Sequence, residues 1–462
     1  MEALSSLSPR AKRYALLATI LGSSMVFIDG TVVNVALPAI QQDLGGGLAA
    51  QQWIVDAYLL TLGSLILVGG SLGDIFGEVR MFTLGVALFG VASVLCAAAP
   101  TSTTLIVFRA IQGVAGALLT PASLAVLTST FSGTERGAAI GTWTAWSGIS
   151  TVIGPLLGGW LIGFTSWRVI FLLNVPLALF TLALVWLHLP HTTQARKDVK
   201  VDFVGAALCV VGLGAFVFGF IEQPRRGWSD PAVWGTIIGG AIALVSFVFY
   251  ERRTEEPMLE LALFKKRNFT VTNIETVAVY GALSAWGFFL TLFLQQIAGY
   301  TPFQAGLATV PLTIGMFLLS RYFGRMSMRF GPRFFMAAGP LLGAVSLLPL
   351  ARLPVDVNYW TDLFPSMVGF AVALSLTVAP LTTTVLSDAG PGDAGIASGI
   401  NNAIARVAGL IAIAVIGVAA AGSTDHLSVA GFHSAMLISA VLLAIGGVIG
   451  AVGIRNPQPQ SS

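Results

Sequence analysis

Fourteen apolar runs divide this chain of 462 residues from one end to the other. A helix needs about 20 mainly apolar residues to cross the hydrocarbon core of a bilayer. The candidate runs are 14–37, 53–72, 82–99, 104–127, 138–161, 169–189, 203–221, 232–250, 270–294, 304–320, 334–350, 362–386, 397–421 and 434–453. Charged residues make up 10% of the chain, whereas soluble proteins average about 25%. The sequence therefore predicts an all-α polytopic membrane protein with fourteen transmembrane helices.

Basic residues in the loops predict the orientation, because cytoplasmic loops are enriched in Lys and Arg. With the N-terminus in the cytoplasm, eighteen of the 24 basic residues fall inside and four fall outside, while Arg109 and Arg406 fall within spans. The inside set includes Arg196, Lys197 and Lys200 of one polar loop. We expect both termini on the cytoplasmic side of the cell membrane and an even number of spans.

The two longest polar connections, 188–201 and 250–269, bracket the seventh and eighth runs. These runs are typical of a helical pair inserted between two six-helix bundles. The predicted parts are an N-terminal bundle at 14–189, the inserted pair at 203–250 and a C-terminal bundle at 270–453.

An internal repeat supports two related bundles. After the second run the chain carries Gly70, Asp74 and Gly77, followed by Arg80. After the tenth run, Gly324, Met328 and Gly331 occupy matching offsets and are followed by Arg333. Such a glycine turn with a charge at the helix end is a candidate hinge between rocking halves, so we assign Gly70, Asp74, Gly77 and Arg80 to gating.

Several function classes are disfavoured by the sequence. No soluble segment is large enough for an enzyme domain, and no lysine follows a glycine, so the phosphate-binding P-loop pattern is absent. The cysteines, Cys96 and Cys209, lie in apolar runs, and the four histidines lie in or beside loops. We expect no enzyme activity, no cofactor or metal, no nucleic-acid partner and a monomer in contact with membrane lipids.

Three acids lie clearly within apolar runs: Asp29, Asp56 and Glu275. On insertion scales an ionised Asp at the centre of a membrane helix costs about 2.5–3.5 kcal/mol, so each acid is a functional candidate. At 1.5 Å per residue, Asp29 and Arg109 both lie roughly 10 Å below the outer surface. A neighbouring arginine favours a charged carboxylate, whereas apolar burial favours the neutral acid. This competition suits a proton carrier, although Arg109 could instead tie down backbone carbonyls.

For the other two acids the sequence leaves more than one role open. Asp56 extends a proton path outward or faces an outer vestibule, and Glu275 contacts a cationic substrate, forms an inner release site or lies at the interface. We interpret Arg406 as structural.

Several motifs in order resemble the Major Facilitator Superfamily, and within it the fourteen-span drug:proton antiporters. The first run resembles the family pattern at Asp29, Thr31, Ala36, Leu37 and Pro38, and the loop after the second run does so at Gly70, Asp74 and Gly77. The fourth run resembles it at Arg109, Gln112, Gly113 and Gly116, and the fifth at Gly148, Gly154, Pro155, Gly158 and Gly159. Further matches to the fourteen-span branch are Trp167, Arg168, Asn174, Pro176, Gln295, Gly299 and Tyr300. The gating loop departs from the family pattern, because Ile75, Glu78 and Val79 replace basic residues and Met328 replaces the second acid.

The resemblance implies that the first and fourth spans line a central cavity and that Asp29 and Arg109 carry the coupling proton. It also implies that Gly154, Pro155 and Gly158 bend the fifth span, pack it closely and prevent leakage. Pro155 lacks a backbone donor, and Gly148, Gly158 and Gly159 would let neighbouring helices approach.

Aromatic and amide side chains near the cavity are candidate substrate contacts, because aromatic faces attract lipophilic cations. These candidates are Phe27, Asn34, Trp143, Trp146, Tyr280, Trp286, Phe288, Phe289 and Gln295.

The sequence thus predicts a proton-coupled antiporter that exports lipophilic, cationic or amphiphilic compounds by alternating access. The alternatives are a dedicated exporter of an endogenous lipid or secondary metabolite, a facilitator without proton coupling, and a membrane receptor that transports nothing.

Overall fold

The computed structural model describes residues 7–190, 201–255, 257–389, 394–421 and 426–456. Helices dominate these ranges, and no β-strand occurs within them. Fourteen helices are long and apolar enough to cross a membrane, which confirms the all-α class and the predicted number of spans. Arg196, Lys197 and Lys200 lie outside the described residues.

The chain forms two compact units, and each is described here by itself. Unit 1 comprises Met1–Phe216, Trp234–Met258 and Thr301–Gly306. Its helices up to residue 188 are α2 (Pro9–Leu44), α3 (Gly47–Phe76), α4 (Glu78–Ala98), α5 (Ser102–Thr130), α6 (Gly133–Phe164), α7 (Arg168–Leu172) and α8 (Asn174–His188).

Unit 2 comprises Val217–Val233, Leu259–Tyr300 and Leu307–Ser462. Its elements are η1 (Leu261–Lys265), α11 (Arg267–Gln296), α13 (Val310–Phe330), α14 (Pro332–Leu347), η2 (Leu350–Arg352), η3 (Tyr359–Leu363), α15 (Phe364–Ala389), α16 (Ala394–Ala421) and α17 (Val429–Gly453). Within this unit α11 packs against α15, α16 and α17, and α14 packs against α15 and α17.

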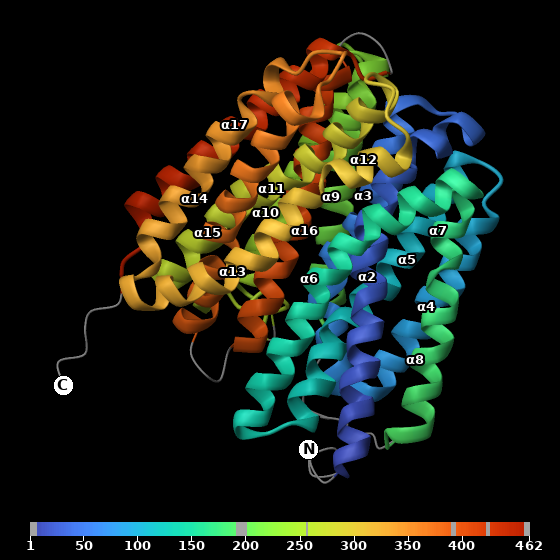
Figure 1. The fold of residues 1–462 in the computed structure, drawn as a ribbon. Helices are drawn as coiled ribbons and strands as arrows, with labels where there is room; N and C mark the ends of the chain where they lie inside the picture. The colour runs from blue at the N-terminus through green and yellow to red at the C-terminus, as the bar shows by residue number, and fades with distance from the viewer. Residues whose placement is uncertain (1–6, 191–200, 256, 390–393, 422–425, 457–462) are drawn as a thin grey trace. The chain divides into compact units, whose positions relative to one another are not determined.

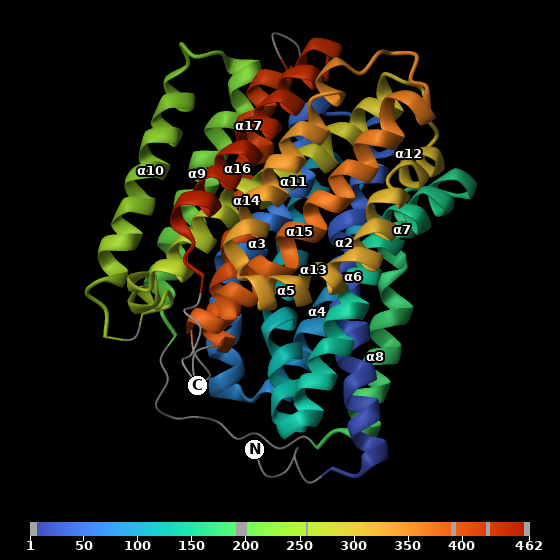
Figure 2. The same cartoon turned by 60° about the vertical axis from the view of Figure 1, so that its left-hand side comes forward.

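Helices α9 (Phe203–Arg226) and α10 (Pro231–Glu251) form the hairpin coloured green in Figure 2, and α12 (Pro302–Ala308) is a short helix. Gly212 of α9 lies against Leu244 of α10, and Gly240 of α10 lies against Phe216 of α9. The division at 14–189, 203–250 and 270–453 stays a prediction.

Three helices differ from their predicted extents for identifiable reasons. Helix α2 extends beyond the run 14–37 to Leu44, because polar residues after Pro38 end the apolar run without ending the helix. In the same way α13 continues to Phe330 through several arginines, beyond the predicted end at residue 320. The sixth run is split into α7 and α8, since Pro176 cannot donate a backbone hydrogen bond to Leu172.

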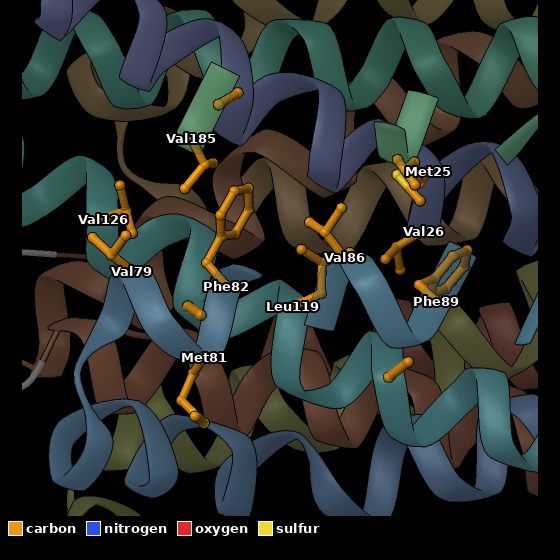
Figure 3. Close-up of a cluster of buried hydrophobic side chains, with 14 of the residues drawn as sticks. Met25, Val26, Val79, Met81, Phe82, Val86, Phe89, Leu119, Val126 and Val185 are labelled. Carbon is orange, nitrogen blue, oxygen red and sulfur yellow. The ribbon is translucent and has the colours of Figure 1, made fainter. Parts of the chain in front are cut away.

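The apolar core of unit 1 joins α2, α4, α5 and α8 (Figure 3). Phe82 and Phe89 of α4 are fully buried and lie near Met25 of α2 and Leu119 of α5. Val185 of α8 belongs to the same cluster. This packing fixes the helices that carry the polar groups described below.

The two copies of the repeated loop share a backbone conformation. Gly77 ends α3 and begins α4 with φ 92° and ψ 134°, and Gly331 ends α13 and begins α14 with φ 86° and ψ 152°. A residue with a Cβ is strained at such positive φ values. The predicted repeat is therefore present in the backbone as well as in the sequence.

Glycines also bring α6 against α2 (Figure 1). A Cβ on Gly154 would overlap Thr31 Oγ1, and one on Gly158 would overlap Val32. Helix α6 is continuous through Pro155. The expected close approach at Gly148 is wrong, because no described atom of a neighbouring helix lies within 4 Å of its Cβ position.

A close approach of α3 to α5 gives a first prediction. A Cβ on Gly69 would overlap the carbonyl oxygen of Ala117 and lie 3.2 Å from Leu118 Cα, whereas the nearest atom to a Cβ on Gly70 is Pro121 Cβ at 3.9 Å. We expect Gly69→Ala to destabilise the protein by about 1–3 kcal/mol through overpacking. The thermal unfolding midpoint in detergent measures this, with Gly70→Ala as the matched control. Equal midpoints for the two variants would contradict the close approach.

Candidate functional site

An ion pair between Asp29 and Arg109 lies at the centre of a polar cluster in unit 1. Arg109 Nη1 of α5 contacts Asp29 Oδ2 of α2. The side chains are 1% and 0% exposed, respectively. The depth estimate from the sequence predicted that these residues could meet, and the structure shows that they do. Because the pair is removed from water, its charges interact strongly and each depends on the other.

Two amide side chains complete the coordination of Asp29. Gln112 Nε2 donates to Asp29 Oδ1 at 2.9 Å, and Asn174 Nδ2 of α8 donates to the same oxygen at 3.1 Å. Gln112 Oε1 accepts from Arg109 Nη1 at 2.6 Å, so one amide serves both charges. Ser93 of α4 accepts from Gln112 at 2.9 Å and from Asn174 at 3.2 Å. The carboxylate is thus held by side chains of α5 and α8, and Ser93 of α4 in turn orients the two amides.

The guanidinium of Arg109 has further partners besides Asp29. Its Nε donates to the carbonyl oxygen of Ile54 on α3 at 3.1 Å, so the structural alternative considered for this arginine is also realised. Its Cζ lies 4.2 Å from the centroid of the Tyr58 ring and 5.8 Å from that of Phe171. A desolvated cation over an aromatic face gains attraction from the ring quadrupole. Arg109 is therefore held by a carboxylate, a backbone carbonyl and two aromatic rings.

Hydroxyl groups form a second polar cluster beside this network. Ser23 Oγ of α2 donates to Ser123 Oγ of α5 at 2.8 Å and accepts from Trp143 Nε1 of α6 at 2.9 Å. Ser150 Oγ of α6 donates to Ser24 Oγ of α2 at 2.8 Å. These bonds join α2 to α5 and α6, and they satisfy polar groups where water is excluded.

The other two candidate acids do not join Asp29. Asp56 of α3 and Glu275 of α11 are each 0% exposed. In the described part of the chain none of their carboxyl oxygens has a hydrogen-bond partner. Their predicted roles in proton coupling remain predictions.

The candidate substrate contacts differ in exposure. Trp146 is 48% exposed, while Phe27, Asn34, Trp143, Tyr280 and Gln295 are half-buried. Trp286 lies 5.0 Å from Phe370, and Phe289 lies 5.0 Å from Phe288, measured between ring centroids. The candidates Trp286, Phe288 and Phe289 are all buried in the helix packing of unit 2 and have no open surface.

Near the C-terminal end of α2 a smaller cluster connects three helices. Trp167 Nε1 donates to Asp43 Oδ2 at 3.0 Å, and Arg168 forms an ion pair with the same carboxylate. Arg168 Nη2 also donates to the carbonyl oxygen of Ala99 after α4. Among the gating candidates, Asp74 in the last turn of α3 and Arg80 in the first turn of α4 are exposed.

Several residues of the network had no role assigned from the sequence. Gln112 and Asn174 lie in recognised motifs, but nothing in a single sequence shows that their amides reach a carboxylate 83 and 145 positions away. Tyr58 and Ser93 are common residue types in apolar runs, and only the packing of α3 and α4 places them here.

Comparison with known proteins identifies the family. A model of the Major Facilitator Superfamily matches residues 19–413. The chain belongs to the Major Facilitator Superfamily. Puromycin resistance protein pur8 of Streptomyces alboniger is 34% identical over 433 residues, which cover 92% of this chain and 85% of that protein. Multidrug resistance protein Stp of Mycobacterium tuberculosis (strain H37Rv) is 33% identical over 409 residues, which cover 88% and 76% of the two chains.

Solved structures show the same superfamily fold. The inward-facing, unoccupied structure of a bacterial homologue of the human lysosomal transporter Spinster aligns with a TM-score of 0.69 at 17% identity. The alignment covers 96% of this chain and 97% of that one. The chain is therefore a multi-pass membrane protein of a transporter superfamily, and Asp29 and Arg109 lie on its first and fourth spans.

The buried pair makes a testable prediction about stability. Asp29→Leu leaves Arg109 without its carboxylate, and an unpaired buried charge costs about 3–5 kcal/mol. The double variant Asp29→Leu/Arg109→Met removes both charges and should recover part of this loss, because an apolar pair of similar volume is often tolerated. Thermal unfolding of the four proteins in the cycle measures the coupling. Independent, additive effects would contradict the pairing.

Proposed function

We propose that this protein is a proton-coupled antiporter that exports lipophilic small molecules from the cytoplasm. Proton binding at Asp29 drives the exchange, and two halves of the molecule alternate in access to the two sides. The proton is the only coupling ion in this proposal, and no organic cofactor or ATP takes part.

The observation that carries the proposal is the buried Asp29–Arg109 pair in a superfamily of transporters. Arginine stays charged under all physiological conditions, so only the aspartate of this pair can change its charge. Protonation of Asp29 cancels its attraction for Arg109, and loss of the proton restores it. A conformational change that separates or joins the two residues is therefore coupled to proton uptake or release.

The surrounding amides are suited to both charge states of the carboxyl group. Gln112 and Asn174 donate N–H groups to the ionised form. Asn174 Oδ1 has no hydrogen-bond partner within the described residues, so rotation of the amide would let it accept the O–H of the neutral acid. An amide that can both donate and accept lowers the cost of moving a proton onto a buried carboxylate.

The cargo assignment follows from the relatives. One is named for puromycin resistance and another for multidrug resistance. Half-buried aromatic residues such as Trp143 and Tyr280, together with exposed Trp146, provide apolar and cation-attracting faces for such compounds. We propose lipophilic, cationic or amphiphilic antimicrobial compounds as the substrate class.

The orientation and the remaining acids belong to the same proposal. We propose that both termini lie in the cytoplasm, and the distribution of basic residues among the loops supports this orientation. Asp56 is a further candidate on the proton path, because its carboxyl group is fully buried on α3. We propose a monomer as the working unit, in contact with membrane lipids.

Growth inhibition tests the cargo and the coupling together. Expression of the wild-type protein in a drug-sensitive strain should raise the inhibitory concentration of several lipophilic cations and antibiotics. Asp29→Asn should abolish this protection although the protein reaches the membrane, since the amide still accepts from Arg109 but cannot carry a proton.

Glu135→Gln provides the matched control. Its carboxylate is 62% exposed and pairs with Lys12, so its removal should leave protection intact. Full protection by Asp29→Asn would contradict proton coupling at this residue. Protection against a single compound would favour a dedicated exporter, and no flux in proteoliposomes would favour a receptor.

A further inference from the structure

Glu275 of α11 is a buried acid with unusual surroundings in unit 2. Its side chain is 0% exposed, and in the described part of the chain neither carboxyl oxygen has a hydrogen-bond partner. A carboxylate buried in this way is unfavourable unless it is paired, because it loses its hydration without gaining a donor. The arrangement therefore suits the neutral acid and not the ion.

The carboxyl group occupies a seam that glycines of α17 leave open. Glu275 Oε2 lies 3.0 Å from the Cβ position of Gly450, and Glu275 Cγ lies 3.9 Å from that of Gly446. The Cβ position of Gly450 also lies 2.6 Å from the carbonyl oxygen of Met336 on α14, and that of Gly446 lies 3.2 Å from Ala278 Cβ of α11. A side chain on Gly450 would therefore crowd the carboxyl group of Glu275, and one on Gly446 would crowd Ala278 beside it. We call this contact of α11, α14 and α17 the glycine seam.

Charged side chains on the neighbouring elements form hydrogen bonds with groups other than Glu275. Arg267 Nε at the start of α11 donates to the carbonyl oxygen of Gly453, and Arg333 Nε at the start of α14 donates to that of Ala451. Both arginines therefore hold the C-terminal carbonyls of α17, within one turn of Gly450. Neither forms an ion pair with Glu275 within 4.0 Å.

The remaining elements packed on α11 and α17 bring no described partner to the acid either. Lys266 beside η1 donates to the carbonyl oxygen of Ala389, and Asp388 of α15 accepts from the backbone of Phe269. The ring of His433 on α17 bonds to the carbonyl oxygen of Leu353. Arg406 of α16 interacts with Tyr280, further along α11. None of the described ion pairs involves Glu275. Its charge state therefore depends on whether the glycine seam is closed and keeps water away from the carboxyl group.

We propose that Glu275 is a second proton-binding group of the transporter, which keeps its proton while α17 lies against α11 and releases it when the glycine seam opens. Water, or Arg333 after leaving the carbonyl of Ala451, stabilises the resulting carboxylate. Because the two arrangements of α17 differ in their affinity for the proton, proton binding in turn favours the closed seam. This inference rests on proton-coupled export as proposed above.

Infrared spectroscopy of the purified protein tests whether Glu275 binds a proton. The wild-type protein should show a carboxylic-acid C=O stretch that Glu275→Gln lacks, and the band should disappear as pH is raised. Thr272→Val is the matched control, because Thr272 lies one turn earlier on α11, is 0% exposed and has a hydroxyl oxygen without a described partner. This control should keep the band. An identical pH-dependent difference spectrum in wild-type protein and Glu275→Gln would overturn the proposal.

Transport in proteoliposomes tests whether this proton is coupled to export. With ethidium as the probe, Glu275→Gln should keep exchange in the absence of a pH gradient, because the neutral amide preserves the closed seam. Its gradient-driven accumulation should fall about tenfold, within the range of typical coupling. If Glu275→Gln does not fold, Glu275→Asp replaces it in the test. This variant keeps a titratable carboxyl group, and the pH dependence of its ethidium transport should be displaced from that of the wild type.

The outcomes separate the two proposals. Normal gradient-driven accumulation by Glu275→Gln beside an active wild type would overturn the role of Glu275 and leave Asp29 unaffected. Absence of pH-driven transport of every compound by the wild type would overturn proton-coupled export, while the infrared result would still decide whether Glu275 binds a proton.

Discussion

The ion pair of Asp29 and Arg109 is removed from water, and neighbouring helices of unit 1 supply the polar and aromatic groups that stabilise it. Helix α3 supplies a backbone carbonyl and the ring of Tyr58, α5 supplies Gln112 beside Arg109, and α8 supplies Asn174. Each of these groups offsets part of the free energy of burying two charges. The close approach of α3 to α5 through glycines is required for the same contacts, since Gly113 lies against the carbonyl oxygen of Tyr58. In this unit the stability of the buried ion pair therefore depends on the close packing of the helices.

The fold and the central pair follow largely from the sequence, whereas the network around the pair does not. Apolar runs of membrane-spanning length predict helices because backbone polar groups in lipid must be satisfied internally. Depth estimated from helix rise placed Asp29 and Arg109 at one level. The ends of α2 and α13 were misplaced because polar residues stop an apolar run before the helix stops. The partners Gln112 and Asn174 depend on helix rotation and lateral packing, which hydrophobic pattern does not determine.

Two of the buried acids, Asp29 of unit 1 and Glu275 of unit 2, are stabilised in different ways. Asp29 is paired with a permanent cation and two amides, so a proton must displace an existing interaction. Glu275 has no such described partner and depends on the contact of α17 with α11 for its neutral form. One acid thus responds to the separation of two charged side chains, and the other responds to the packing of two helices. Two acids of these kinds would couple protons to movements within each unit.

The most direct test of the account follows proton and substrate movement in the same vesicles. Purified protein is reconstituted with a pH-sensitive dye inside, and a fluorescent lipophilic cation is added. We predict that the wild-type protein moves protons in the opposite direction to the compound, and that Asp29→Asn abolishes the proton flux. Transport of the compound by the wild type without any proton movement, or proton flux in Asp29→Asn equal to that of the wild type, would contradict the central claim.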